Sequence, residues 1–156
     1  MSNTAVHAPV AGRAIPLAEV PDPVFSTGMV GYGAAVDPPR EVIDAVAPVS
    51  GKLLRLMPHA FVIMTADNVG VLVHLGIDTV ALEGEGFTTH VSQGDDVRAG
   101  QRIVTYDVPA IVARGLNPVV PVVVMDERNA GNIKPDEAVL EGAVIAPGDD
   151  LFTAHT

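Results

Sequence analysis

Two of the five histidines in this 156-residue chain have the spacing for shared chemistry. His59 and His74 flank two apolar runs, Ala60–Thr65 and Gly70–Leu75, that are typical of buried strands. If these runs form a hairpin that reverses over Ala66-Asp67, the two histidines lie directly opposite each other. Opposed side chains on one face have Cβ atoms about 4.5–5.5 Å apart. The other histidines are predicted to face solvent, two near the chain ends and one on an outward strand face: His7, His155 and His90.

A facing histidine pair fits three roles. In a structural role, a backbone carbonyl would satisfy each ring, although two imidazoles side by side repel once either is protonated. A metal site would need at least a third protein ligand, and no third histidine stands near the pair in sequence. In a covalent role, one neutral imidazole would act as a nucleophile while the other donates a hydrogen bond to the captured group. The residues alone leave these alternatives open.

The elements that must position the pair are predicted to be strands. The chain has 13 Pro and 15 Gly, and Pro in a helix interior costs about 3 kcal/mol. Long helices are therefore excluded from most of the chain, and the expected fold class is all-β. Besides the two apolar runs, the patterns predict strands at Phe87–Val91, Arg102–Tyr106 and Val119–Met125 and a short helical turn at Ile111–Gly115.

Two internal echoes indicate a duplicated architecture. The segment Ala8–Leu17 reappears as Ala47–Leu56, and Gly94–Ile103 reappears as Gly142–Leu151. Each echo has the composition of a strand–turn–strand unit, in which Gly supplies the turn and Val, Ile or Leu the buried positions. Two copies of each unit predict a sandwich made of two related halves.

Charge and cysteine usage exclude several functions. The formal net charge is −10, which opposes binding to nucleic acid and to anionic membranes but steers a basic protein partner toward the chain. There is no cysteine, which rules out disulfides and thiolate catalysis. No apolar run reaches the roughly 20 residues that a membrane span needs, and no signal peptide is visible. These features lead us to expect a cytoplasmic protein.

The segment around His74 resembles the active-site stretch of the glucose-type IIA component of the bacterial phosphotransferase system. It reads His74-Leu-Gly-Ile-Asp-Thr-Val80, preceded by Val71-Leu-Val73 and followed by Gly84-Glu-Gly-Phe87. The fifteen-residue separation of the two histidines matches as well. Further blocks match in order along nearly the whole chain: Ala8–Gly12, Val20–Phe25, Val30-Gly31, Ala47–Gly51, His59–Phe61 and Pro118–Val120.

The resemblance implies a compact antiparallel β-sandwich of the duplicated hybrid type and a role as a phosphotransferase component, with no cofactor and no metal. His74 would accept a phosphoryl group from phospho-HPr on Nε2 and pass it to a cysteine of a sugar-specific IIB domain of the IIB/IIC transporter. His59 would hydrogen-bond the phosphoryl oxygens. The resemblance also implies that acidic and apolar side chains bind the partners: Asp22, Asp78, Phe25, Met29, Val30 and Phe61.

The sequence departs from this family at three places. A hydroxyl residue usual two positions before the first histidine is Met57 here, followed by Pro58, so a backbone carbonyl is a candidate for orienting His59. A glycine usual six positions before the second histidine is Asn68. The family's membrane-tethering tail is expected to be missing, since residues 1–7 are predicted to be loose and residues 8–156 to form one domain.

Other functions compete with the phosphoryl carrier. A regulatory module would dock its unphosphorylated apolar face onto metabolic enzymes or permeases, and this role is compatible with the first. A zinc hydrolase would need an additional ligand set that the sequence does not show. A biotin or lipoyl carrier would need a lysine at a hairpin tip, a setting that Lys52 lacks. The choice of sugar is expected to lie in the membrane partner.

Overall fold

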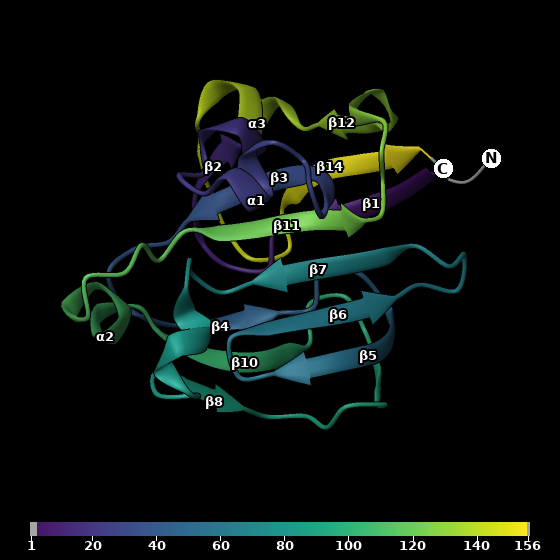
Figure 1. Ribbon diagram of the computed structural model, residues 1–156. Helices are drawn as coiled ribbons and strands as arrows, with labels where there is room; N and C mark the ends of the chain where they lie inside the picture. Colours follow the sequence, from purple (N-terminus) through teal and green to yellow (C-terminus); the bar gives the residue numbers. More distant parts are fainter. Residues whose placement is uncertain (1–2, 156) are drawn as a thin grey trace.

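Within residues 3–155, the strands fall into two sets of seven with the same internal pairing. The two sets lie in the upper and the lower part of the molecule in Figure 1. The computed structural model describes residues 3–155. One set, here called the inner half, is a continuous stretch of chain. It contains β4 (Val42–Val46), β5 (Gly51–Met57), β6 (Ala60–Met64), β7 (Gly70–His74), β8 (Phe87–Thr89), β9 (Asp96–Val97) and β10 (Arg102–Asp107).

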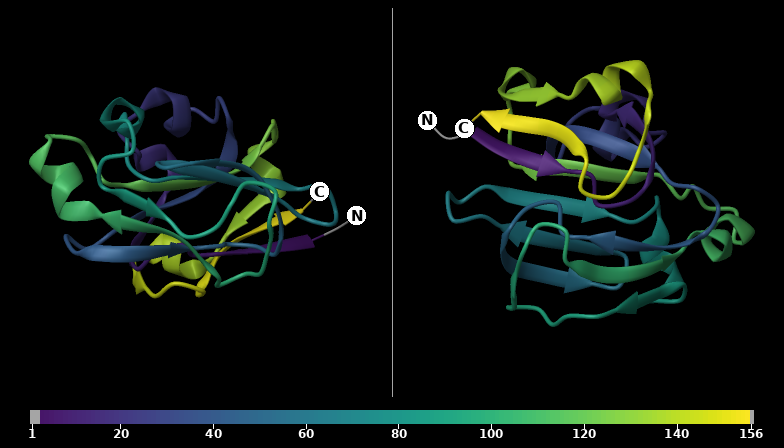
Figure 2. Two further views of the ribbon diagram at one scale, coloured as in Figure 1. Left: turned by 90° about the horizontal axis from the view of Figure 1, so that it is seen from below. Right: turned by 180° about the vertical axis from the view of Figure 1, so that it is seen from behind.

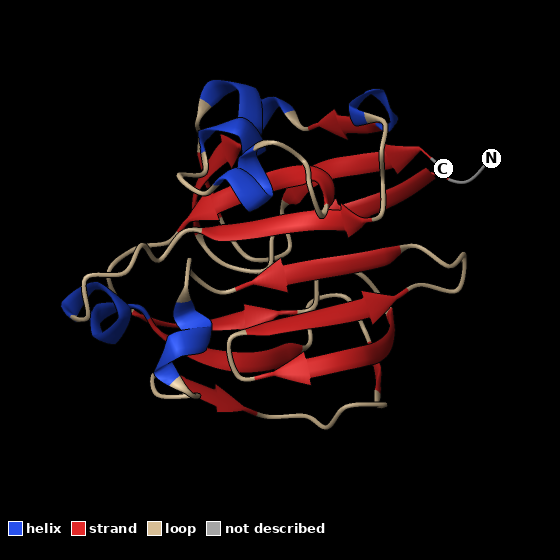
Figure 3. Ribbon diagram, viewed as in Figure 1, coloured by secondary structure: helices blue, strands red, loops and turns tan. Residues whose placement is uncertain are grey.

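The other set, the outer half, is interrupted by the inner half between its third and fourth strands. It contains β1 (Asn3–His7), β2 (Gly12–Pro16), β3 (Gly31–Asp37), β11 (Val120–Met125), β12 (Ile133–Pro135), β13 (Val144–Ile145) and β14 (Asp150–His155). Short helical segments lie between the strands (Figure 3). They are η1 (Leu17–Glu19), α1 (Pro23–Ser26), η2 (Thr79–Leu82), α2 (Val108–Ala113), η3 (Ala130–Asn132) and α3 (Glu137–Glu141).

Equivalent strands of the two halves make equivalent pairs. The long sheet has the order β13-β2-β3-β11-β7-β6-β5-β9. Counted inward from its two edges, β13 corresponds to β9, β2 to β5, β3 to β6 and β11 to β7. The short sheets, β1-β14-β12 and β4-β10-β8, correspond in the same way. Backbone bonds repeat too, since Ala8 N donates to Asp149 O at 2.7 Å and Ala47 N donates to Gln101 O at 2.8 Å. All strand pairs are antiparallel. The prediction of a duplicated antiparallel β-sandwich is confirmed.

The long sheet and the two short sheets form two layers (Figure 2), and the main core consists of side chains from both layers. It is dominated by aliphatic side chains from both halves, of which Val6, Leu53, Ile63, Val71, Ile103, Val122 and Leu151 are among the fully buried ones. A second, smaller cluster covers the opposite face of the long sheet beneath η1 and α1. It includes Leu17, Val20, Phe25, Val62, Leu72, Ile77 and Val123. The histidine pair lies beside this second cluster.

The register of the β6–β7 hairpin differs by one residue from the predicted one. His74 pairs with Ala60 rather than with His59. The reason is a three-residue loop, closed by the hydrogen bond that Thr65 N donates to Val69 O, in place of the expected two-residue reversal. Its last residue, Asn68, has a φ of +62°, a left-handed conformation that glycine adopts freely and asparagine tolerates.

The prediction of a loose N-terminus is wrong for residues 3–7. These residues form β1 and pair along β14, from Asn3 opposite His155 to His7 opposite Asp150. The pairing satisfies their backbone groups and buries Val6 completely. Residues 1–2 lie outside the described residues, and the single domain over 8–156 stays a prediction.

Most expected elements were found with shifted ends. The helical turn expected at Ile111–Gly115 is α2, which begins at Val108 because the Asp107 side chain accepts a hydrogen bond from Ala110 N and Pro109 lies in the first turn. The strand expected to reach Val91 ends at Thr89. In the described part of the chain, no helix has the length and hydrophobicity needed to cross a membrane.

Candidate functional site

His74 ends β7 with its imidazole held by a backbone carbonyl. Its Nδ1 lies 2.5 Å from Gly76 O. A carbonyl oxygen only accepts hydrogen bonds, so Nδ1 must carry the proton. In the neutral ring the proton is then absent from Nε2, which is left with a free lone pair. The local turn therefore selects the tautomer in which Nε2 is nucleophilic.

The turn after His74 has room only for glycine at position 76. Gly76 has a φ of +85°, and a Cβ built on it would lie 2.6 Å from the Thr79 side chain. Thr79 is fully buried, and its hydroxyl donates to Leu75 O at 2.8 Å. The Gly-Ile-Asp-Thr sequence thus folds into a tight turn that brings the Gly76 carbonyl back toward the imidazole.

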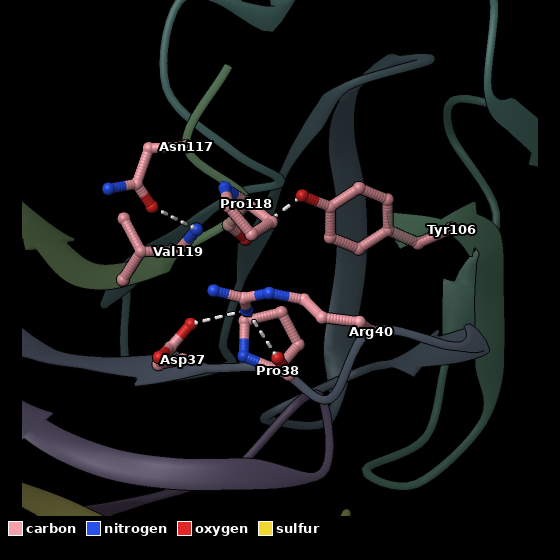
Figure 4. Close-up of polar contacts among 7 residues, drawn as sticks. All are labelled: Asp37, Pro38, Arg40, Tyr106, Asn117, Pro118 and Val119. Atoms are coloured by element: carbon pink, nitrogen blue, oxygen red, sulfur yellow. Dashed lines mark hydrogen bonds and ion pairs between the residues drawn. The ribbon is translucent and has the colours of Figure 1, made fainter. Parts of the chain in front are cut away.

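A segment of the outer half backs this turn. Gly76 N donates to Val119 O at 3.1 Å and Ile77 N donates to Asn117 O at 2.9 Å. The Asn117 side chain in turn accepts from Val119 N at 3.0 Å (Figure 4). The turn that orients His74 is therefore fixed against a second, independently hydrogen-bonded segment.

His59 reaches His74 from a turn and not from a strand. Met57 pairs with Ala60, so Pro58 and His59 form the two-residue connection between β5 and β6. The His59 ring meets the His74 ring edge-on, with centroids 5.2 Å apart and planes at 74°. Side chains of a strand must alternate between its two faces, but His59 lies in a turn and is not bound by this rule. The two imidazoles therefore come together even though the predicted register was wrong by one residue.

The backbone of His59 secures this position. His59 O accepts from Leu75 N at 2.7 Å, which ties the turn to the residue after His74. The expectation that a backbone carbonyl orients the His59 ring finds no support in residues 3–155, where no hydrogen bond to its ring is found. Packing orients the ring instead, since His59 is only 8% exposed.

Asp22 and Phe25 reach the histidines from the segment over the long sheet. The Asp22 carboxylate caps α1 by accepting from Val24 N at 2.9 Å. The cap starts the helix that places the Phe25 ring against His74, with centroids 5.2 Å apart and planes at 57°. Phe25 is almost fully buried, so it shields the imidazole from water more than it offers surface to a partner.

The other predicted contact residues are divided between surface and core. Asp78 is exposed, has a φ of +60° and makes no capping bond with its side chain. Met29 is 62% exposed and Val30 is half-buried. Phe61, by contrast, is fully buried in the main core. Its side chain points to the face of β6 opposite Ala60 and Val62, so we remove it from the set of partner-binding residues.

Three side chains on or against the segments that form the site had not been singled out from the sequence. Val24 and Val80 are large apolar residues that are 41% and 64% exposed on the segments carrying Asp22 and Asp78. The sequence feature that could have identified these two valines is that each is an apolar residue two positions after an aspartate of the family motif, Asp22 or Asp78. Tyr106 lies behind Gly76, and nothing in the sequence distinguished it from any other core aromatic.

Burial dominates the electrostatics of the pair. It lowers the pKa of His74 below the ordinary 6.5, and the bond to Gly76 and the carboxylates of Asp22 and Asp78 offset part of this shift. Burial also lowers the pKa of His59, and the neighbouring His74 lowers it further. Both rings are therefore neutral at pH 7.

We expect both rings to take up their protons at a lower pH than an exposed imidazole does, because their folded pKa values lie below the ordinary 6.5. An NMR titration of the imidazole protons measures both midpoints. In a His74→Gln variant the His59 midpoint should rise toward 6.5, because the like-charged neighbour is gone. A midpoint at or above 6.5 for His74 in the wild type would contradict the shielding by burial and Phe25.

The site as a whole is an imidazole with a free Nε2 lone pair beside a second imidazole, in an apolar setting with two carboxylates nearby. In the described range 3–155, no group of three or more His, Cys, Asp or Glu side chains is placed to hold a metal ion. The fold and the site together define a class of antiparallel β-sandwich proteins with a paired-histidine site.

Comparison with known proteins places the chain within this class. Residues 4–130 match the family model described as the phosphoenolpyruvate-dependent sugar phosphotransferase system, EIIA 1, and the chain belongs to this family. The solved glucose permease IIA from Mycoplasma capricolum superposes with a TM-score of 0.84 at 37% identity, covering 98% of this chain and 96% of that one.

Two relatives show the same component in different contexts. The glucose-specific EIIA component of Oceanobacillus iheyensis is 40% identical over 131 residues, 83% of this chain and 78% of the relative. The mannose-specific EIIBCA component of Corynebacterium glutamicum is 40% identical over 129 residues, which is 83% of this chain but 19% of that protein. The chain therefore spans about a fifth of the length of this larger relative. The protein is a sugar phosphotransferase system component of the EIIA type.

Proposed function

We propose that this protein relays a phosphoryl group, accepting it from phospho-HPr on His74 Nε2 and passing it to a sugar-specific IIB domain. The observation that carries the proposal is the bond from His74 Nδ1 to Gly76 O, which leaves Nε2 as the free nucleophile. The family membership supports the same role.

In the first step, the Nε2 lone pair attacks phosphorus, the Nε2–P bond forms, and the bond from phosphorus to the donor breaks. Nδ1 keeps its proton, and its bond to Gly76 O strengthens as the ring gains positive charge. Positioning and charge stabilisation are the main requirements of such a transfer. In the second step, a thiolate of the IIB domain attacks phosphorus and the Nε2–P bond breaks.

His59 and the surroundings of the pair would serve the phosphorylated state. A neutral His59 ring at 5.2 Å has one N–H group, which would donate to a phosphoryl oxygen. The Phe25 ring limits access of water, which protects the phosphohistidine until the partner arrives. Asp22 and Asp78 would repel the phosphate in isolation. Cations of a bound partner would neutralise them, so transfer is favoured in the complex.

Incubation with phosphoenolpyruvate, Enzyme I and HPr tests the first step. Intact-mass measurement should show one added phosphoryl group per chain, and the label should be acid-labile and stable in base, as phosphohistidine is. Addition of candidate IIB domains then tests the second step by loss of the label. Failure of the wild-type protein to gain a phosphoryl group would contradict the proposal.

The partners and location follow from the same proposal. The EIIBCA relatives carry B, C and A components in one chain, which supports a IIB/IIC transporter as the recipient. The relay would operate on the cytoplasmic side of the membrane, where phosphoenolpyruvate is available. Neither nucleic acid nor insertion into a membrane is part of this function.

A regulatory docking role is the second candidate, because Met29 and the two valines Val24 and Val80, on the segments that carry Asp22 and Asp78, are exposed apolar side chains. A phosphoryl group on His74 would add about two negative charges near Asp22 and Asp78 and weaken an apolar contact made by these segments. We expect immobilised unphosphorylated protein to retain metabolic enzymes or permeases that the phosphorylated protein releases. Equal retention by both forms in a quantitative pull-down would argue against phosphorylation-controlled docking.

A further inference from the structure

A buried tyrosine lies directly behind the turn that orients His74. Tyr106 on β10 is fully buried, and its ring stacks on Phe87 with centroids 5.4 Å apart. Its hydroxyl donates to the buried carbonyl of Pro118 at 2.9 Å (Figure 4). Burial raises the pKa of Tyr106 far above its usual range, so the hydroxyl remains a donor at every physiological pH.

The Pro118 carbonyl belongs to the segment that holds the active turn. The carbonyls on either side of it are also acceptors. Gly76 N donates to Val119 O at 3.1 Å and Ile77 N donates to Asn117 O at 2.9 Å. Gly76 O then accepts from His74 Nδ1. A continuous path of hydrogen bonds and peptide units thus leads from the phenol to the nucleophile.

The hydroxyl also limits Gly76 by direct contact. A Cβ built on Gly76 would lie 3.0 Å from Tyr106 Oη and 3.3 Å from Asn117 O. The backbone of Gly76 is therefore confined between the phenol on one side and the 117–119 segment on another. Small displacements of this backbone would lengthen the bond that selects the His74 tautomer.

We propose that the hydroxyl of Tyr106 is a positioning group for phosphoryl acceptance. By fixing the 117–119 segment and the backbone of Gly76, it holds the Gly76 carbonyl at His74 Nδ1 and keeps Nε2 unprotonated. The kinetic part of this inference rests on the proposed function. The tautomer is a property of the free protein and is tested without any phosphoryl donor.

The Tyr106→Phe variant removes the hydroxyl and keeps the ring stacked on Phe87. In ¹⁵N spectra of the neutral imidazoles, the fraction of His74 with a proton on Nε2 should rise about 3–10-fold, the range expected for loss of one hydrogen bond. The kcat for phosphoryl acceptance should fall in proportion to the fraction of His74 that still carries its proton on Nδ1. The KM for phospho-HPr should stay unchanged, because the exposed contact residues are untouched.

Two further variants separate positioning from general stability. Tyr32→Phe alters the only other tyrosine of the chain, which lies on β3, and should leave the His74 tautomer and kcat unchanged. Asn117→Ala removes the side-chain acceptor of Val119 N at an exposed position. It should shift the tautomer in the same direction as Tyr106→Phe, to a smaller extent.

The outcomes are decisive in each case. A Tyr106→Phe protein with the wild-type tautomer ratio and kcat would overturn the inference, even if it melts at a lower temperature. An equal shift in Tyr32→Phe would overturn it as well. If Tyr106→Phe does not fold, Asn117→Ala decides alone, since a shift supports the inference and its absence refutes it. If the wild-type protein accepts no phosphoryl group, the proposed function fails while the ¹⁵N result still decides the positioning role.

Discussion

The His74→Gln variant is expected to accept no phosphoryl group from phospho-HPr, with a rate below about one-hundredth of the wild-type rate. Glutamine preserves much of the volume beside Phe25 and retains a hydrogen-bond donor for Gly76 O. It lacks the ring nitrogen whose lone pair attacks phosphorus. The measurement is the incorporation of label from phosphoenolpyruvate in the presence of Enzyme I and HPr.

A matched control isolates the nucleophile from histidine content in general. His90→Gln changes an exposed histidine whose ring bonds to the Thr105 hydroxyl at 2.6 Å, outside the site. It should accept label at the wild-type rate. Undiminished labelling of His74→Gln, or loss of labelling in His90→Gln, would show that the phosphoryl group goes to another residue.

His59→Gln is expected to separate the two transfers. The variant should gain its phosphoryl group at close to the wild-type rate, because His74 and its bond to Gly76 are intact. Passage to a IIB domain should slow by about 10²–10³-fold, the usual contribution of a positioned hydrogen-bonding or proton-donating group. The amide of glutamine can donate a hydrogen bond to the phosphoryl group. It cannot act as an acid, because it neither gives up a proton nor takes up positive charge near neutral pH.

Single-turnover kinetics with prephosphorylated protein measure this second transfer directly. His59→Ala serves as the companion variant, since it also removes the donor and should be slower still. Transfer from phosphorylated His59→Gln at the wild-type rate would exclude His59 from the mechanism. Equal slowing of both transfers would instead indicate that the substitution disturbs His74 itself.

The repeated segments and the histidine motif made most of the fold predictable. The first echo contains β2 and β5, and the second contains β9 with the start of β10 and β13 with the start of β14; these strands occupy equivalent places in the two halves. What the repeats could not reveal is that one half is inserted into the other. That arrangement depends on the long-range pairing of β3 with β11, for which neither strand carries a local signal.

The site was predictable where residue type decides the chemistry and less so where packing does. His59 and His74 were identified by type and spacing, but their predicted register failed because a loop of three residues and a loop of two cannot be told apart from composition. Phe61 was placed among the partner-binding residues by the family resemblance. Strand alternation places it in the main core.

The insertion of the inner half has a consequence for how the protein acquires activity. Residues 42–107 pair with one another over at most 65 residues of sequence, between Val42 and Asp107, whereas the outer half joins residues up to 152 apart, Asn3 and His155, at a larger loss of chain entropy. Local pairing therefore favours early assembly of the half that contains both histidines. Asp22, Phe25 and the 117–119 segment come from outside that half. A newly made chain would thus hold its imidazole pair in water, with an unselected tautomer, until the outer strands close over it, and competence for phosphoryl transfer would be the last property to form.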